Sequence, residues 1–192
     1  MKKRLLALLL VVVMIASMIV LPAGAESVDF GSTPKTTCPH CGADWDSIEW
    51  KEFGYSAEAA LEGTGILTGH YYVADDQKVK SAYTFGSHEG QTEDLAVDVC
   101  VDLQGCTIEA SKADTRVLFV YNYSRLSIID SVGGGQVIGT GKTGSGGTIY
   151  QAKNSRVDLY NGKLVNAQTD RTKNGGVVFV NTVQIAELLV KE

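Results

Sequence analysis

The feature that most constrains this chain is an internal repeat that begins near residue 95. Three similar segments, at Val101, Leu126 and Val157, start about 25 to 31 residues apart. Each segment alternates apolar and polar side chains, which is the period of a β-strand with one buried face. Self-similarity at this period is typical of architectures in which each repeat is one structural unit stacked on the next.

Two further sets of similar segments repeat along the chain with a comparable spacing. Residues 146–150 match residues 175–179, and short segments that begin at Cys106, Gln136 and Lys163 match one another. The segments are separated by Gly, Asn, Asp and Ser, which tolerate the backbone angles of sharp corners. No amphipathic helical pattern of about 10 to 15 residues lies between them, which disfavours a fold that alternates strands with helices.

These patterns predict an all-β fold, a right-handed parallel β-helix (solenoid) of about three to four coils over residues 69–192. In such a solenoid each coil stacks on the previous one at ~4.8 Å, and equivalent side chains form ladders. We expect Val101, Leu126 and Val157 to lie in one file inside the tube. One coil cannot bury its apolar residues alone, so the ends need caps. For the C-terminal end two alternatives stay open, a capping helix over residues 184–190 or a truncated reading frame.

Residues 1–25 have the layout of a secretory signal peptide. Three basic residues precede the apolar run 5–21, and small residues lead to a cleavage position after Ala25. An uncleaved anchor is the alternative for this run. The sequence therefore predicts a secreted, extracellular chain that has no membrane partner after signal cleavage.

The charge balance narrows the class of partner. The chain carries 17 basic and 22 acidic residues, a net charge of −5, and its sequence pI is about 5.2. Binding to nucleic acid needs a basic face that meets the phosphates. We therefore expect no nucleic-acid partner, and the partner class that we expect is an extracellular glycan or a host or cell-wall surface.

Residues 26–68 are expected to form an N-terminal leader and capping region. Residues 26–37 are polar and rich in turn formers, and residues 55–61 form a good short helix with Ser56 as its N-cap. This helix is placed to close the N-terminal end of the solenoid.

The four cysteines fall in two close pairs. Cys38 and Cys41 form a C-x2-C pair, which is one half of a structural zinc site. The other half is not evident, because His40, His70 and His88 stand at no persuasive spacing from this pair.

Three states therefore stay open for Cys38 and Cys41: a degenerate zinc knuckle, a vicinal disulfide or free thiols. Cys100 and Cys106 lie ~20 Å apart if their strand is extended, which is too far for a disulfide bond unless Gly105 turns the chain. We expect buried, unpaired thiols at these two positions.

The order of these motifs resembles a family of secreted bacterial right-handed parallel β-helix proteins that share the pectin-lyase-like fold. The residues that carry the resemblance are 69–76, 99–108, 126–131, 133–135, 146–147, and Cys38 and Cys41 followed by Trp45 and Trp50. The resemblance implies a surface or adhesin-like protein of unknown ligand. Two features depart from the family: further metal-ligand residues after Cys41 are absent, and family members carry many more coils.

Polar side chains on the outer face of the coils are the candidates for ligand binding. We expect Arg125 and Arg156 to stack on adjacent coils beside Asp158 and Tyr160. A guanidinium ladder can bind sugar carboxylates, and a tyrosine ring can stack on a sugar. A solvated face without a ligand is the alternative interpretation of the same four residues.

A catalytic arrangement is harder to build from this sequence. Asp102 and Asp158, with Ser127 between them on the outer ladder, would be ~10 Å apart across two coils. An inverting hydrolase holds its carboxylates ~6.5–9.5 Å apart. We assign no catalytic residue and leave open whether the chain is an enzyme.

The function that we expect is that of an extracellular, non-catalytic β-solenoid, surface-exposed and adhesin-like, that binds glycans through the outer face of its coils. The alternative is a polysaccharide lyase or glycoside hydrolase, or an inactive fragment of one, with the pectin-lyase-like fold. We expect no required cofactor, and the metal that we consider is a structural zinc ion at Cys38 and Cys41.

Overall fold

The computed structural model describes residues 27–29, 35–54, 66–87, 95–141, 147–167, 176–180 and 187–190. The predicted signal peptide, the predicted helix over residues 55–61 and His88 lie outside these residues.

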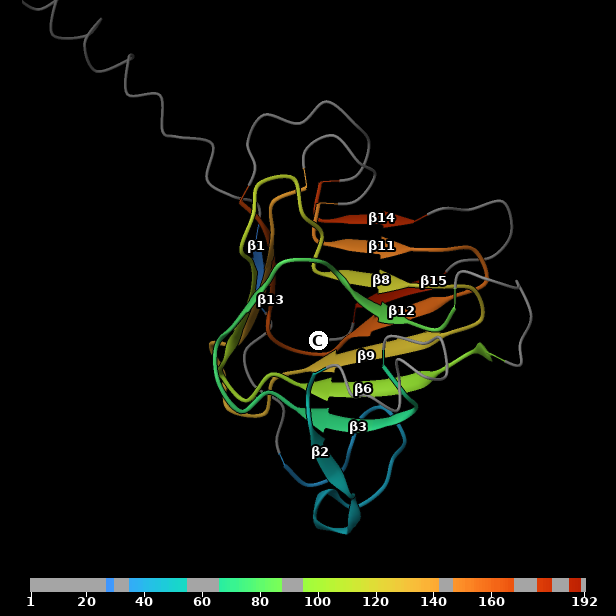
Figure 1. Cartoon of the computed structure of the whole chain (residues 1–192). Coiled ribbons are helices and arrows are strands. Elements are labelled where there is room, and N and C mark those ends of the chain that lie inside the picture. Colours follow the sequence, from blue (N-terminus) through green and yellow to red (C-terminus); the bar gives the residue numbers. More distant parts are fainter. Residues whose placement is uncertain are drawn as a thin grey trace, which may run out of the picture.

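Short β-strands make up almost all of the regular structure, and they form three sheets around a common interior (Figure 1). The first sheet contains, in spatial order, β15 (Glu187–Val190), β12 (Arg156–Leu159), β9 (Arg125–Ile129), β6 (Asp98–Asp102), β3 (Gly69–Tyr72) and β2 (Trp50–Glu52). The second contains β1 (Ser27–Asp29), β13 (Lys163–Asn166), β10 (Gln136–Gly139), β7 (Thr107–Ala110) and β4 (Gln77–Val79). The third contains β14 (Val178–Val180), β11 (Ile149–Gln151), β8 (Leu118–Val120) and β5 (Tyr83–Phe85).

The chain visits the three sheets in a fixed order, so each circuit adds one strand to every sheet. β3, β4 and β5 form one circuit, and β6, β7 and β8 form the next, parallel to it. The circuits continue through β9 to β14 in the same parallel register. This arrangement of about three turns confirms the predicted all-β parallel solenoid.

The side chains inside the tube form the expected files, with one correction of register. Leu126 pairs with Val157 as predicted, but the residue of β6 that pairs with Leu126 is Val99, two positions before Val101. Val101 instead pairs with Ile128. A shift of two residues keeps the same face inward, so the apolar pattern alone does not detect it. All five of these side chains are buried.

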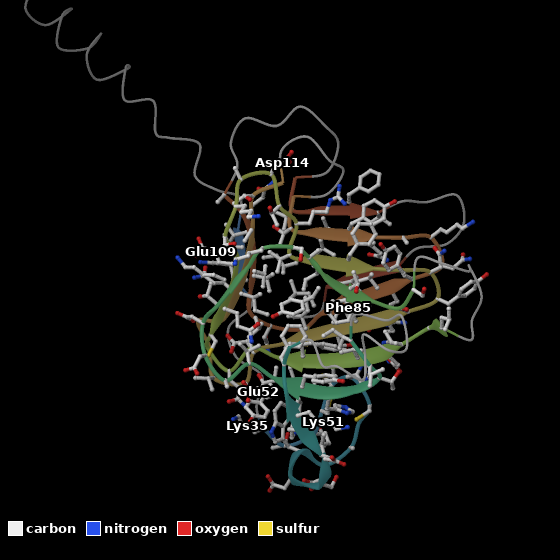
Figure 2. The ribbon with its side chains drawn as sticks, viewed as in Figure 1. Lys35, Lys51, Glu52, Phe85, Glu109 and Asp114 are labelled. Atoms are coloured by element: carbon white, nitrogen blue, oxygen red, sulfur yellow. The ribbon has the colours of Figure 1, made fainter. Side chains whose placement is uncertain are left out.

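Aromatic side chains close the first turn of the tube. Phe85 is fully buried, and the Phe53 ring stacks over it at a centroid distance of 6.4 Å. Figure 2 shows Phe85 inside the tube between the sheets. Tyr71 and Tyr83 also contact Phe53. These rings belong to one continuous apolar core.

The corners between the first and second sheets are built around buried carboxylates. The side chain of Asp130 accepts hydrogen bonds from the backbone N–H groups of Gly105 (2.8 Å), Gly133 (3.1 Å) and Gly135 (2.6 Å). Asp102 in the preceding coil accepts from the backbone N–H of Ser131 at 2.9 Å. These carboxylates satisfy backbone donors that the corner would otherwise bury without a partner.

The N-terminal segment covers the outer face of the first sheet. Trp45, in the short 3-10 turn η1 (Trp45–Ser47), packs in a second apolar cluster with Cys38, Cys100 and Tyr160. Its ring stacks on that of Trp50 at 4.6 Å. The outer face of this sheet is therefore partly a second core rather than a solvated surface.

Both ends of the described chain add strands to the solenoid. β1 lies in the segment for which the sequence predicts a leader, and it pairs antiparallel with β13. β15 pairs parallel with β12. The capping helix considered for residues 184–190 is therefore wrong for residues 187–190, which continue the first sheet.

Candidate metal centre

A ladder of side chains of different chemical types runs along the outer face of the first sheet. The register pairs Trp50 with His70, His70 with Cys100, Cys100 with Ser127, and Ser127 with Asp158. The strands β3, β6, β9 and β12 turn their other face to the apolar core. An indole ring from β2 and polar or sulfur-bearing groups from these four strands therefore stand side by side under the N-terminal segment.

The C-x2-C motif forms a tight turn above this ladder. The backbone N–H of Gly42 donates to the Cys38 carbonyl at 2.7 Å, and the N–H of Cys38 donates to the Ala43 carbonyl at 2.9 Å. Gly42 has a φ of +76°, a conformation that glycine adopts without strain. Thr37 and Asp44 form an antiparallel bridge that closes the base of the turn. The turn presents Cys38 and Cys41 from one short loop.

His40 and Arg125 dock this turn onto the sheet. The Nδ1 of His40 lies 2.8 Å from the Ser127 hydroxyl, and its Nε2 lies 3.3 Å from an Asp98 carboxylate oxygen. Arg125 donates to the His40 carbonyl at 3.4 Å. This pattern fits a neutral His40 that donates from Nε2 and accepts at Nδ1.

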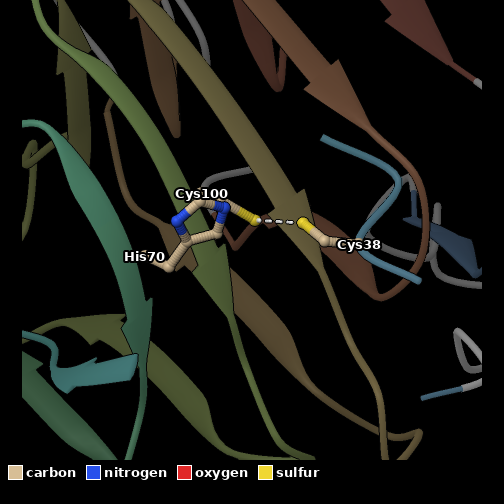
Figure 3. A group of neighbouring side chains, drawn as sticks. All are labelled: Cys38, His70 and Cys100. Carbon is tan, nitrogen blue, oxygen red and sulfur yellow. Dashed lines mark hydrogen bonds between the residues drawn. The ribbon is translucent and has the colours of Figure 1, made fainter. Parts of the chain in front are cut away.

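The docked turn brings Cys38, His70 and Cys100 together (Figure 3). The sulfur atoms of Cys38 and Cys100 are 3.8 Å apart, and one ligand atom from each of the three residues lies within 4.8 Å of the others. Cys38 and Cys100 are fully buried. Cys41 lies on the exposed side, where its sulfur is 3.3 Å from the Nε2 of His70. Cys38, His70 and Cys100 therefore lie close enough to bind a metal ion.

Burial and the contact between the sulfur atoms of Cys38 and Cys100 give the thiols different pKa values. The hydrogen bond from Cys100 lowers the pKa of the Cys38 thiol to about 4. The same hydrogen bond, followed by burial, raises the pKa of the Cys100 thiol well above its ordinary 9.0. Partial desolvation raises the pKa of Cys41. Cys38 is thus the thiolate of the group, and a thiolate is the form that binds metal.

The sequence predicts only part of this cluster. The C-x2-C motif indicates Cys38 and Cys41, whereas no spacing in the sequence links His70 to them, and the expectation for Cys100 is a buried thiol without a partner. All four cysteines are free thiols, and Cys100 has Cys38 as its hydrogen-bond partner. The signal that could have found the site is the register: once Val99 is aligned with Leu126, Cys100 pairs with Ser127 and, in the preceding coil, with His70.

The four residues predicted to bind ligand lie together next to this cluster. Asp158 is fully buried between two arginines, with Arg125 Nη2 at 2.8 Å and Arg156 Nε at 2.9 Å. Tyr160 is buried in the cluster under Trp45, and burial raises the pKa of its hydroxyl. The arginines stack on adjacent coils as expected, and their charges are directed to Asp158.

The outer acidic ladder differs from the one that the sequence predicts. Asp102 pairs with Ile129, so it does not share a ladder with Ser127 and Asp158. Asp102 and Asp158 are both fully buried. Each carboxylate is bound by groups of the same chain, Asp102 by Ser131 and Asp158 by arginine.

Comparison with protein-family models, curated proteins and solved structures returns no match for this chain. The resemblance to secreted β-helix proteins with the pectin-lyase-like fold therefore stays a prediction beyond the solenoid itself. Among the described residues, no helix is long and apolar enough to cross a membrane.

Proposed function

We propose that this chain is an extracellular, non-catalytic β-solenoid whose N-terminal cap is held in place by one structural zinc ion. The ligands of the ion are Cys38, Cys41, His70 and Cys100. Two come from the cap and two come from adjacent coils, so the ion joins the cap to the solenoid. The closed and capped solenoid then presents its outer surface in a surface-exposed, adhesin-like role.

The observation that carries the proposal is the spacing of the ligand atoms. Zinc in a tetrahedral site lies about 2.3 Å from each thiolate sulfur, which places two sulfurs ~3.8 Å apart. Cys38 and Cys100 have this separation, 3.8 Å. The 3.3 Å between Cys41 and His70 is close to the ~3.5 Å expected for a sulfur and an imidazole nitrogen on one zinc ion.

The type of donor also favours zinc. Three thiolates and one imidazole are a recurrent set for structural zinc, whereas calcium and magnesium prefer oxygen ligands. A site with four protein ligands has no open position for a substrate, so the ion would act on stability rather than on a reaction. The buried carboxylates Asp102 and Asp130 also have structural tasks, since backbone N–H groups donate to them.

The test is metal analysis of the purified chain together with cobalt substitution. We expect about one zinc per chain, as four protein ligands in one tetrahedral site require. We also expect the strong visible absorption of tetrahedral, thiolate-bound cobalt(II) after exchange. Cys100→Ser and His70→Ala should each reduce the zinc content and change the cobalt spectrum.

Cys106→Ser is the matched control. Cys106 is a half-buried cysteine that packs against the inner core and contributes nothing to the cluster. This variant should keep the wild-type zinc content and cobalt spectrum. A wild-type chain that binds no zinc at micromolar free metal, or whose cobalt spectrum is octahedral, would refute the proposal.

A further inference from the structure

The third sheet carries a groove that the metal centre does not involve. It has a volume of about 340 Å³, and its lining includes Lys80, Ser81, Asp114, Thr115, Arg116 and Phe119. This volume lies at the small end of the ~300–1,000 Å³ typical of small-ligand sites. Figure 2 shows Asp114 on the side of the molecule away from Lys35 and Lys51.

Phe119, which lines the groove, belongs to a column of aromatic rings. The register places Phe119, Tyr150 and Phe179 on successive coils of the third sheet. The rings of Phe119 and Tyr150 stack at 4.3 Å, and Tyr150 and Phe179 follow at 5.4 Å. All three rings are half-buried on the outer side of the sheet. The column is therefore an apolar surface that meets the groove at Phe119.

This column fixes Arg116 in the groove. The guanidinium carbon of Arg116 lies 5.4 Å from the centre of the Phe119 ring and 5.3 Å from that of Tyr150. These are cation–π distances, which restrict the guanidinium without neutralising it. Arg116 makes no hydrogen bond or ion pair with the part of the chain that the structure describes. Its N–H groups are therefore available to an anion.

The loop that carries these groups is held by the next coil. The Thr140 hydroxyl accepts a hydrogen bond from the backbone N–H of Thr115 at 3.1 Å and donates to the Lys112 carbonyl at 2.6 Å. The backbone of Thr140 bonds both Asp114 and Thr115. Asp114 has a φ of +56°, an uncommon conformation for a residue with a side chain. The groove wall is thus preorganised, which lowers the entropy cost of binding.

We propose that this groove binds one acidic sugar unit of an extracellular glycan. Arg116, with Lys80 beside it, would bind the carboxylate or sulfate group of the sugar. A planar guanidinium can form two parallel hydrogen bonds to such an anion. The hydroxyls of Ser81 and Thr115 would bind sugar hydroxyl groups, and Phe119 would contact the apolar face of the ring.

The charge of the chain favours this occupant over a nucleic acid. The net charge is −5, so a long polyphosphate backbone would be repelled by the acidic chain outside the groove. A single carboxylated sugar needs only a local cation. This inference deepens the proposed surface role by naming the class of partner, and it places the site at Arg116 rather than at Arg125 and Arg156.

The test is isothermal titration of the zinc-loaded chain with oligogalacturonate, sialyllactose, a chondroitin sulfate oligosaccharide and, as the neutral probe, maltohexaose. We expect saturable binding to at least one acidic probe and none to maltohexaose. Arg116→Gln should weaken that binding about ten-fold or more, since it removes charged hydrogen bonds. Arg116→Lys should recover part of it, because a point charge replaces a bidentate contact.

Lys78→Gln is the matched control, because Lys78 is an exposed cation on the second sheet that pairs with Glu109. It should leave the affinity unchanged. Absence of binding to every acidic probe, equal binding by Arg116→Gln, or tighter binding to single-stranded DNA than to any glycan would overturn the inference. Zinc content measured on the same samples separates this failure from failure of the proposed metal centre.

Discussion

His70 and Cys100 occupy directly paired positions on the adjacent strands β3 and β6. Both side chains lie on the outer face of the sheet, because their neighbours Tyr71, Val99 and Val101 fill the core. Parallel pairing within a solenoid thus converts two residues from different coils into neighbours. The cap then needs to add only the Cys38–Cys41 turn to complete the proposed four-ligand set.

Removal of the metal should destabilise the chain without unfolding the solenoid outright at room temperature. An ion present at about 100 times its Kd stabilises the folded state by about 2.7 kcal/mol. For a chain of 192 residues such a loss lowers Tm by roughly 5–11 °C. Thermal unfolding followed by circular dichroism, before and after treatment with a strong chelator, measures this shift.

Restoring zinc should return the original Tm, which separates metal loss from irreversible damage. The Cys100→Ser variant should have a low Tm that the chelator does not lower further. A chelator that lowers the Tm of wild type and of this variant equally would show that the effect does not come from the cluster.

The stability of the chain should fall as the pH drops below about 6.5, and His40 should contribute to the fall. Burial, the largest cause, lowers the pKa of His40 below its ordinary 6.5, although Asp98 opposes the shift. Arg125 and His70 also lower this pKa, and Cys38 raises it. Because the unfolded chain takes up the proton first, the contribution is complete above pH 6.5 and is lost as the pH falls through the folded pKa.

The measurement is urea unfolding of zinc-saturated protein at several pH values between about 5 and 7.5. His40→Gln keeps a hydrogen-bonding side chain that does not titrate, so its unfolding free energy should depend less steeply on pH. The difference in slope is limited to about 1.4 kcal/mol per pH unit for one proton. Identical slopes for the two proteins would contradict this role of His40, because protonation of the zinc ligands is common to both.

The solenoid could be predicted from sequence because the patterns that specify it lie within short stretches of the chain. Strands with period-2 alternation and Gly- or Asp-rich corners specify a coil, and the repeat specifies stacking. The register was less certain, because Val99 and Val101 are both apolar and two residues apart. Because of this ambiguity, the pairing of Cys100 with His70 could not be predicted from the sequence.

The cap could not be predicted in the same way. Whether an outward residue such as Asp158 or Tyr160 meets solvent depends on a segment more than a hundred positions earlier in the chain. No periodic pattern links Cys38 or Trp45 to the face that they cover. Contacts of this kind are specified by shape and by paired donors and acceptors, which a single sequence does not display.

The corner carboxylate Asp130 should be among the most sensitive positions of the fold. It is fully buried and accepts three backbone hydrogen bonds of 3.1 Å or less. Asp130→Ala would leave these donors buried and unpaired, at about 1–3 kcal/mol for each unpaired group. We expect a loss of about 3 kcal/mol or more in the free energy of unfolding, measured by urea denaturation.

Asp75→Ala is the control for this change, because Asp75 is an exposed aspartate in the corresponding corner two coils earlier, between β3 and β4. Surface substitutions of this kind usually change stability by less than about 0.5 kcal/mol. Equal stabilities of the Asp130→Ala and Asp75→Ala variants would show that the buried carboxylate does not organise the corner.

The ion-pair network around Asp158 should act on stability. Asp158 is fully buried, and the side chains of Arg125 and Arg156 are 28% and 34% exposed. Asp158→Asn would keep the size of the side chain but remove the charge that balances two guanidinium groups. Removing one partner of a buried pair costs about 3–5 kcal/mol, and partial exposure of the arginines reduces this to about 2–3 kcal/mol. Urea unfolding of this variant should show that loss, with zinc content unchanged because Asp158 is not a ligand. A variant as stable as wild type would mean that solvent, rather than Asp158, satisfies the two arginines, and it would return them to the set of residues open to an external ligand.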